Sequence, residues 1–523
     1  MIKTARYAKI QLAILLLWSS SMAQVITSKE IDDVTERTLK AFDVPGIAVA
    51  VVKDGKVIHA KGYGVRSLKT MQRVDENTLF GVASNSKAFT SAALGILIDQ
   101  GKLTWDTRVI DIIPEFRMYN AYVTEEFTVR DLLTHRSGLG LGAGDLMFWP
   151  DSSNFTMKDI IHNLRFLKPV SAFRTKYDYD NLLYMVAGEV LERVSGQSWV
   201  EFIEERIMKP LEMTQSAGSY ERLKDKRNVI DAHGVVNGKV QVIARDLFRF
   251  GFSAAGVNSS VADMSKWVIM QMQDGKYGKG QKNRLFSEKV HREMWTPQTI
   301  LPVNTTPPYN THFSAYGLGW VLSDVKGYKQ ISHTGGLAGM VTQVTMLPEL
   351  QLGIIVFTNQ QSGAAFSTIT NTIKDSYLGI PATDRVKKNS DAVKAQVAEA
   401  DSITNSIFTA ILSEQKNGSG KVDLKSFTGT YRDDWFGEVI ISNIDNRIWF
   451  KSLRSPKITG EMFFYKNNTF IVKWNNRSLD ADAYVNFQKD ENDRPVSIKM
   501  KPISPLTDFS FDFQDLDLQR VQK

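Results

Sequence analysis

Residues 84–101 read SNSKAFTSAALGILIDQG, so the pattern S-x-x-K stands at the start of a run typical of a buried helix. The run from Lys87 to Gln100 carries one apolar face and stops at Gly101. A serine at the start of such a helix lies in the positive field of its N-terminus, and an amine three positions later lies one turn on, on the same face. Because apolar surroundings lower the pKa of a lysine, we expect Lys87 to be able to accept a proton from Ser84.

The S-x-x-K pattern alone is weak, because it occurs at two further places. Ser323–Lys326 lies on a polar, hairpin-like stretch, and Ser413–Lys416 lies in a connector. We expect both of these pairs at the solvated surface. The context of Ser84, at the start of a strongly helical run, therefore selects it as the candidate nucleophile.

Two other short motifs carry candidate site residues. Tyr179–Asn181 forms Y-x-N in a polar loop just before a helical run, whereas the Y-x-N patterns at 465–467 and 484–486 are typical of turns. His333-Thr334-Gly335 forms H-x-G at the end of a predicted strand and is followed by Gly336. Glycines at a strand edge allow a substrate to lie close against the backbone. These two segments are therefore candidates for substrate contact.

Several other chemistries are excluded by missing patterns. The nucleophile elbow G-x-S-x-G does not occur, which counts against an α/β-hydrolase. The H-E-x-x-H motif, the P-loop and zinc-ligand spacing are absent as well. The chain has no cysteine, which excludes thiol nucleophiles and disulfide frameworks. We therefore expect neither a metal nor a cofactor.

The region 24–382 has strand patterns at both ends and helical patterns between them. Expected strands are Ile47–Val52, Val57–Lys61, Gln330–Thr334, Met340–Met346 and Leu352–Thr358. Expected helices are Met157–Leu164, Tyr184–Val194, Val200–Met208 and Val261–Met272, the last with Ser260 and Asp263 as a capping pair. This order predicts an α+β fold, with a helical domain inserted into an antiparallel sheet domain.

The C-terminal part differs in kind. Residues 383–420 have the composition of a connector, with a helix-prone stretch at 391–399 and a flexible break at 417–420. Residues 421–523 are rich in aromatic residues and contain short alternating runs separated by turn residues. These runs are 430–435, 438–442, 447–451, 469–474, 483–488 and 496–500. They predict a small antiparallel barrel or sandwich.

Residues 1–23 have the pattern of a secretory signal. Lys3, Arg6 and Lys9 precede an apolar stretch too short to span a bilayer, and Ala23 ends a small-x-small cleavage pattern. Removal of this segment lowers the formal charge from +7 to +4, which is too weak to indicate a nucleic-acid partner. We expect an exported protein, periplasmic or secreted, without a stable membrane span.

The order S-x-x-K, Y-x-N, H-T-G resembles the penicillin-recognising serine hydrolases, in the branch of class C β-lactamases, DD-carboxypeptidases, D-aminopeptidases and related esterases. The resemblance covers about residues 26–380 and includes the flanking phrases 132–139, 255–260 and 316–320. It implies a β-lactamase-like fold. The C-terminal region is similar to the lipocalin-like barrels appended to some peptidases of this branch, and we expect it to shape access or assembly without supplying catalytic groups.

The resemblance also implies roles for the motif residues. Ser84 would form an acyl-enzyme, while Lys87 and Tyr179 would share general-base duty, the tyrosine as a phenolate. Asn181 would hold Lys87 and a substrate amide. The backbone N–H groups of Ser84 and Gly336 would form the oxyanion hole. Substrate would bind along His333, Thr334, Gly335 and Gly336, with Thr334 contacting its polar groups.

One departure from the family pattern bears on which class of substrate the protein takes. Many β-lactamases and carboxypeptidases have a lysine where this chain has His333, and histidine is largely neutral near pH 7. This favours a peptidase or D-amino-acid amidase acting on a small peptide or amide, then an esterase, then a β-lactamase. A non-catalytic penicillin-binding or sensor protein and a carbohydrate-binding module are the competing hypotheses. Assembly into a homo-oligomer stays open, as does whether Asp180, beside Tyr179, faces the site.

Overall fold

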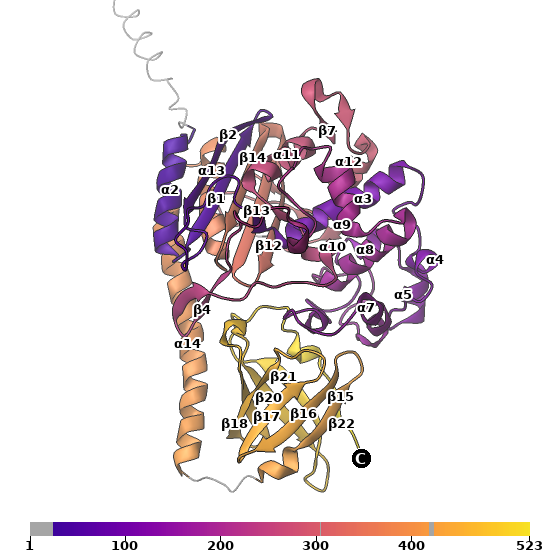
Figure 1. Ribbon diagram of the computed structural model, residues 1–523, viewed down its shortest axis with the longest axis vertical. Coiled ribbons are helices and arrows are strands. Elements are labelled where there is room, and N and C mark those ends of the chain that lie inside the picture. Colours follow the sequence, from indigo (N-terminus) through magenta and orange to yellow (C-terminus); the bar gives the residue numbers. More distant parts are fainter. Residues whose placement is uncertain (1–24, 304, 418–422, 523) are drawn as a thin grey trace, which may run out of the picture.

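The computed structural model describes residues 25–303, 305–417 and 423–522. The predicted signal at 1–23 lies outside the described residues, as does most of the break predicted at 417–420. The described residues form a sheet domain with inserted helices, followed at the C-terminal end by a barrel (Figure 1). Within the described ranges, no helix is long and apolar enough to cross a bilayer.

The centre of the first domain is an antiparallel sheet, which confirms the predicted α+β class. In the part of the chain that the structure describes, this sheet has eight strands in the order β2-β1-β14-β13-β12-β11-β10-β9. Their bounds are β1 Gly46–Lys53, β2 Lys56–Gly64, β9 Thr299–Ile300, β10 Ser314–Tyr316, β11 Val321–Val325, β12 Tyr328–Leu337, β13 Met340–Leu347 and β14 Leu352–Thr358. Pairing of β1 with β14, from Ile47 opposite Thr358 to Lys53 opposite Leu352, joins the two ends of the domain.

Residues 47–52 of β1 are all apolar and buried, as expected for a strand whose two faces are both covered. Ile47, Val49 and Val51 pack in one cluster with α2 (Ser28–Ala41) and α13 (Gly363–Tyr377), neither of which was predicted. The alternate residues of β1 pack in the larger cluster on the opposite face, which contains α11 (Val261–Met272) and α3 (Ser86–Asp99). The sheet is thus the middle layer of three.

The inserted helices largely follow the sequence pattern. α7 (Met157–Asn163), α8 (Asn181–Ser195) and α11 correspond to predicted helices, and the Ser260 side chain accepts from the Asp263 N–H as expected. The run 200–208 divides into α9 (Trp199–Ile203) and a wider π-turn over Glu204–Met208. The surface expectation for Ser323 was wrong: it is 9% exposed within β11, where its hydroxyl accepts from Gln330.

Within residues 423–522 the chain forms a closed barrel of the strands β15 to β22, which confirms the predicted β-barrel. The strands are β15 Gly429–Asp433, β16 Gly437–Ile444, β17 Arg447–Ser452, β18 Thr459–Lys466, β19 Thr469–Trp474, β20 Ala483–Lys489, β21 Pro495–Pro502 and β22 Leu518–Arg520. The pattern missed β18 and the short β22. The predicted run 483–488 corresponds to β20, so the Y-x-N pattern at 484–486 lies inside a strand, where a turn was expected.

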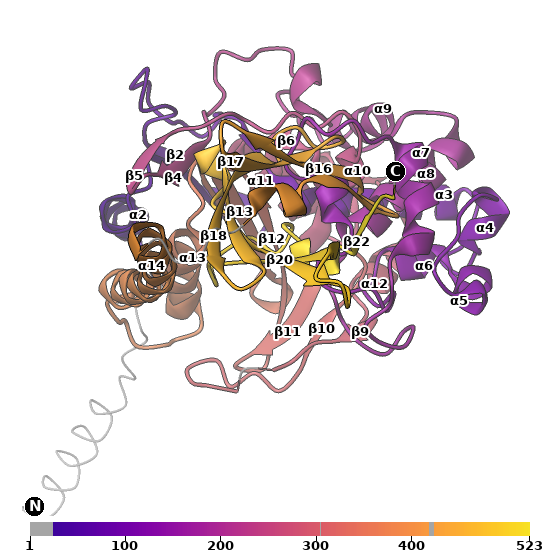
Figure 2. The same cartoon turned by 90° about the horizontal axis from the view of Figure 1, so that it is seen from below.

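The barrel packs against the helical side of the first domain. Figures 1 and 2 show it at one end of that domain, with α14 (Arg385–Asn417) running alongside. Phe155 stacks on Phe436 of the barrel with ring centroids 6.4 Å apart, and the Arg454 guanidinium lies 3.8 Å from the centre of the same Phe155 ring. Buried residues of both parts belong to one hydrophobic cluster. The barrel and the first domain therefore share a continuous core.

Candidate active site

Ser84 lies in a tight turn directly before α3. The turn is a 3-10 segment, Ala83–Asn85, and Ala83 has φ 51°, in the left-handed region that a residue with a Cβ seldom adopts. Thr342 on β13 secures this turn, because its hydroxyl donates to the Val82 carbonyl and accepts from Asn85 Nδ2, both at 2.9 Å. Backbone strain of this kind is common at reactive residues.

Lys87 is completely buried one turn after Ser84. Its Nζ donates to Ser84 Oγ at 3.0 Å, to Asn181 Oδ1 at 2.7 Å and to the Ala254 carbonyl at 3.1 Å. Burial lowers the pKa of Lys87 to about 7, although the acidic side chains of Asp145 and Asp180 raise it in part. An amine with this pKa is substantially neutral at physiological pH and can take the proton of Ser84.

Tyr179 covers the buried amine from the cleft side. Lys87 Nζ lies 4.8 Å from the centre of the Tyr179 ring, and the His135 ring centroid lies 4.2 Å from it. Burial raises the pKa of Tyr179 well above its ordinary value, and a hydrogen bond with Ser84 offsets only part of that rise. Burial therefore favours the neutral phenol over the phenolate that the resemblance implies.

His333 is buried on β12 and faces another tyrosine. Its Nδ1 contacts the Thr334 carbonyl, so Nδ1 carries the proton and Nε2 accepts from the Tyr316 hydroxyl at 2.9 Å. Burial lowers the pKa of His333 to about 3, and the positive charge of Lys87 contributes to this lowering. The imidazole is thus neutral, and both of its nitrogens are occupied by protein groups.

Gly335, in the H-x-G motif, and Gly336, which follows it, have different surroundings. Thr334 and Gly336 line the cleft at Ser84, whereas Gly335 is absent from its lining. A Cβ on Gly335 would lie 2.3 Å from the Val82 carbonyl oxygen, so β12 packs directly against the turn that carries Ser84. Gly335 therefore contributes close backbone packing, where a substrate contact was expected.

Asn181, the first residue of α8, connects Lys87 to a carboxylate that the motifs did not reveal. Its Nδ2 donates to Asp145 Oδ2 at 2.8 Å, and the hydroxyl of Ser510, from the barrel, donates to the same oxygen at 2.8 Å. Burial raises the pKa of Asp145, which the hydrogen bonds from Ser510 and Asn181 oppose. No local motif marks Asp145 or Ser510, because their partners are distant in sequence.

Asp180 faces away from the cleft. Its Oδ2 accepts from Ser137 at 2.6 Å, and its backbone N–H donates to His135 Nδ1 at 3.0 Å. Burial raises the pKa of Asp180 to about 7. His135, Ser137 and Asp180 thus join the loop 133–139 to the segment that carries Tyr179.

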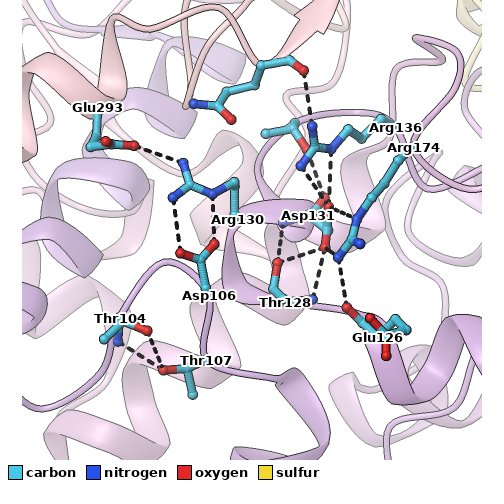
Figure 3. Close-up of polar contacts among 12 residues, drawn as sticks. Thr104, Asp106, Thr107, Glu126, Thr128, Arg130, Asp131, Arg136, Arg174 and Glu293 are labelled. Carbon is cyan, nitrogen blue, oxygen red and sulfur yellow. Dashed lines mark hydrogen bonds and ion pairs between the residues drawn. The ribbon is translucent and has the colours of Figure 1, made fainter.

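A buried ion cluster secures the same two segments (Figure 3). Asp131 of α6 (Val129–Leu132) is fully buried and binds Arg136 at 3.1 Å and Arg174 at 2.7 Å. Its Oδ2 also accepts from the Thr128 hydroxyl at 2.7 Å. Burial raises the pKa of Asp131, but the hydrogen bonds from Arg174 and Thr128 outweigh it and leave the pKa lowered. The carboxyl group is therefore ionised and structural.

Ser84 lies on the wall of a cleft of about 380 Å³. Its lining also includes Tyr179, Asn181, His333, Thr334 and Gly336. Aromatic side chains supply much of the lining, among them Phe148, Trp149, Tyr177, Phe248, Tyr316 and Phe509. The barrel contributes Asp508, Phe509 and Ser510, a contribution that the sequence did not indicate. Among the described residues, no lysine or arginine lines the cleft, and no cluster of histidine or carboxylate side chains is suited to a metal ion.

The chain matches two family models and is similar to known proteins over most of its length. Residues 31–377 match the family described as Beta-lactamase, and residues 414–520 match a domain of unknown function, DUF3471. The chain is 28% identical to an unguisins hydrolase, ungD, of Aspergillus violaceofuscus over 439 residues, which cover 78% of this chain and 76% of the relative. It is 25% identical to protein flp of Staphylococcus aureus over 339 residues, 64% of each chain.

Two solved structures have the same fold at low sequence identity. An octameric penicillin-binding protein homologue from Pyrococcus abyssi superposes with a TM-score of 0.61 at 21% identity, over 92% of this chain and 99% of its own. A class C β-lactamase superposes with a TM-score of 0.54 at 20% identity, over 68% of this chain and 96% of its own. The first of these overlaps extends beyond the sheet domain into the C-terminal part.

Proposed function

Because this chain belongs to the β-lactamase family of serine hydrolases, we propose that it cleaves amide or peptide bonds through an acyl-enzyme on Ser84. One observation carries the proposal: the buried Nζ of Lys87 lies 3.0 Å from Ser84 Oγ, and burial lowers the pKa of that lysine to about 7. A nucleophile and a base at this distance are sufficient to begin acyl transfer.

In the proposed reaction, neutral Lys87 takes the Ser84 proton as Oγ attacks the substrate carbonyl carbon. Backbone N–H groups of Ser84 and Gly336 stabilise the oxyanion, each by about 3 kcal/mol. The C–N bond then breaks, and the leaving amine takes a proton from the Tyr179 phenol, which Lys87 reprotonates. Water attacks the resulting ester and releases the acid, with its proton returning through Lys87 to Ser84 Oγ.

A cleft lined by a neutral His333 and by Asp508 favours an amide or peptide without a carboxylate next to the reacting bond. His333 stands where a lysine would bind such a group, and its pKa of about 3 leaves it uncharged. Among the described residues the cleft wall lacks lysine and arginine, while its aromatic side chains suit apolar substituents. The relative named unguisins hydrolase supports hydrolysis as the activity. An esterase on the same site is the second candidate, because the geometry at Ser84 also suits an ester.

Two other interpretations have less support. A β-lactamase acts on a substrate that carries a carboxylate, which His333 does not match. A non-catalytic penicillin-binding or sensor protein has no need for a buried lysine held by three hydrogen bonds beside a serine.

The decisive experiment compares the full chain with Ser84→Ala. Each is incubated with a fluorophosphonate probe and with a fluorescent penicillin, and intact mass is measured. We expect the wild type to gain one fluorophosphonate adduct and Ser84→Ala to gain none. Labelling that persists in Ser84→Ala would refute the assignment, and wild-type labelling by penicillin alone would favour a penicillin-binding protein.

We also propose an export signal, a division into domains and an oligomeric state for this chain. Residues 1–23 form a cleaved export signal that directs the chain to the periplasm or medium, residues 24–382 form the hydrolase domain, and residues 383–420 connect it to the barrel at 421–523. The two family matches, 31–377 and 414–520, support this division. The octameric state of the Pyrococcus abyssi homologue supports assembly into a homo-oligomer, which light scattering of the purified chain would test.

A further inference from the structure

We infer that Ser510, on the barrel, is a positioning residue for the hydrolase site: its hydroxyl orients Asp145 and, through Asp145 and Asn181, the amine of Lys87. This inference rests on the proposed function, in which Lys87 is the base for Ser84. It gives the barrel a part in the chemistry, whereas the sequence led us to expect effects on access or assembly alone.

The chemistry of the groups sets the direction of every hydrogen bond in this chain of contacts. In its ammonium form Lys87 has donors and no acceptor, so this form requires the Oδ1 side of Asn181, at 2.7 Å. The Nδ2 of Asn181 then faces Asp145 Oδ2 at 2.8 Å, where it can only donate. The Ser510 hydroxyl donates to the same oxygen at 2.8 Å. If that hydroxyl is removed, Asn181 remains the only described donor within reach of Asp145 Oδ2.

The barrel also holds the turn on which Asp145 lies. Asp512 accepts from the backbone N–H of Gly144 at 2.6 Å and of Leu146 at 3.0 Å, the two neighbours of Asp145. A Cβ on Gly142 would lie 2.8 Å from the Phe509 carbonyl oxygen, so the two backbones are in close contact. The loop 508–512 therefore supports this turn at its start and on both sides of Asp145.

Ser510 affects the pKa of Lys87 electrostatically, through Asp145. Burial raises the pKa of Asp145 to about 8, and the hydrogen bond from Ser510 opposes that rise by favouring the ionised form. The negative charge that Asp145 carries when ionised favours the ammonium form of Lys87. The other titratable groups that face this pair are Asp180 before α8, Asp512 on the barrel loop, His135, Tyr179, Tyr184, and His333 on β12. Loss of the Ser510 hydroxyl leaves these groups in place, so Lys87 should lose its proton at a lower pH.

The test measures the rate of fluorophosphonate labelling between pH 5 and pH 9 in the full chain, for the wild type, Ser510→Ala and Ser510→Thr. We expect the acid limb of the Ser510→Ala profile to move to lower pH and its plateau to fall about tenfold, because the lysine becomes a weaker and less well oriented base. Ser510→Thr, which keeps the hydroxyl, should restore the position of the acid limb. Ser504→Ala is the matched control, since Ser504 lies in the same connection between β21 and β22 and caps only its own backbone at Leu506.

A second variant keeps the test decisive if Ser510→Ala does not fold. Asp145→Asn removes the charge with little change of shape and should move the acid limb in the same direction. An unshifted profile in the folded variants, or a uniform loss of rate at every pH, would overturn the positioning role while Ser84 remained the labelled residue. Absence of Ser84-dependent labelling in the wild type would instead overturn the proposed function.

Discussion

The carboxylate of Asp131 accepts a hydrogen bond from Arg174 Nη2 at 2.7 Å, and this contact joins α6 to the loop that leads into Tyr179. Arg174 also donates its backbone N–H to the Arg136 carbonyl at 2.8 Å. Two segments distant in sequence are thereby held together below the site. The cluster thus holds the loop that precedes Tyr179 in the chain, although Asp131 does not line the cleft.

Removal of Asp131 should therefore destabilise the protein strongly. Asp131→Ala leaves Arg136 and Arg174 without their shared buried partner, and we expect the free energy of unfolding to fall by about 3–5 kcal/mol. Urea denaturation at pH 7 measures this loss. Asp106→Ala is the control: it removes the partner of Arg130, but its side chain is 73% exposed, so a loss below about 1 kcal/mol is expected. Equal losses in the two variants would contradict the structural role of Asp131.

The stability difference between the wild type and Asp131→Ala should also depend on pH. The pKa of Asp131 is lower in the folded chain than in the unfolded chain, because the hydrogen bonds of Arg174 and Thr128 outweigh burial. Its contribution is therefore complete above the unfolded carboxyl pKa, about 4, and is lost as the pH falls through the lower folded value. The stability difference between wild type and Asp131→Ala should shrink below pH about 4. A difference that stays constant down to pH 2 would argue against this linkage.

Labelling of Ser84 should depend on the protonation of Lys87. Since the pKa of Lys87 is lowered to about 7, the neutral amine is formed as the pH rises through that value, and the labelling rate should rise with it. Lys87→Ala should slow labelling by about 10²- to 10⁴-fold. Lys326→Ala, at the exposed end of the second S-x-x-K pattern, serves as the control and should label at the wild-type rate. A Lys87→Ala variant with an unchanged rate would remove the lysine from the mechanism.

Two adjacent glycines should respond differently to alanine. A Cβ at position 335 would lie 2.3 Å from the Val82 carbonyl oxygen, whereas at position 336 the nearest atom, on Val341, lies at 3.9 Å. Gly335→Ala must separate β12 from the turn that carries Ser84, so we expect a lower melting temperature and slower labelling. Gly336→Ala should keep the wild-type melting temperature. Thermal unfolding of the two variants checks this, and identical melting temperatures would show that the contact at 335 relaxes freely.

The hydrogen bond between Tyr316 and His333 should contribute measurably to stability. Tyr316→Phe leaves the buried Nε2 of His333 without its donor, which typically costs about 1–3 kcal/mol. Tyr119→Phe, on a side chain that is 55% exposed, is the control and should change the free energy of unfolding by less than about 0.5 kcal/mol. Urea denaturation of both variants measures the difference. An unaffected Tyr316→Phe variant would mean that His333 finds another partner.

Removal of the barrel should affect the hydrolase domain itself. A chain that ends at residue 420 loses the contacts of Phe436 and Arg454 with Phe155, and Asp512 no longer holds the turn of Asp145. We expect the shortened chain to expose apolar surface, to associate in size-exclusion chromatography and to label poorly. A monomeric shortened chain that labels at the wild-type rate would show that the barrel is dispensable for the site.

The local sequence pattern was enough to predict the helix that follows Ser84 and carries Lys87, the central strands and most of the barrel. Each of these elements depends on the spacing of apolar residues and on caps within a few positions, such as Ser260 and Asp263 on α11. The short β22 was missed because its three residues carry little pattern of their own, and it is fixed by pairing with β15 and β21. The strand β18, which pairs with its chain neighbours β17 and β19, was also missed. The geometry of the third motif was only partly predictable, since the role of Gly335 depends on how closely β12 approaches Val82.

Which groups surround the amine of Lys87 was decided by tertiary packing. Ser510 reaches Asp145 across 365 positions, and Asp131 reaches Arg174 across 43, distances over which residue spacing carries no information. Burial likewise comes only from the assembled core, and burial sets the protonation of Lys87, Tyr179 and His333. The sequence specifies the reactive side chains and their local turns; packing of the barrel, the helices and the sheet removes water from them and thereby sets their charges.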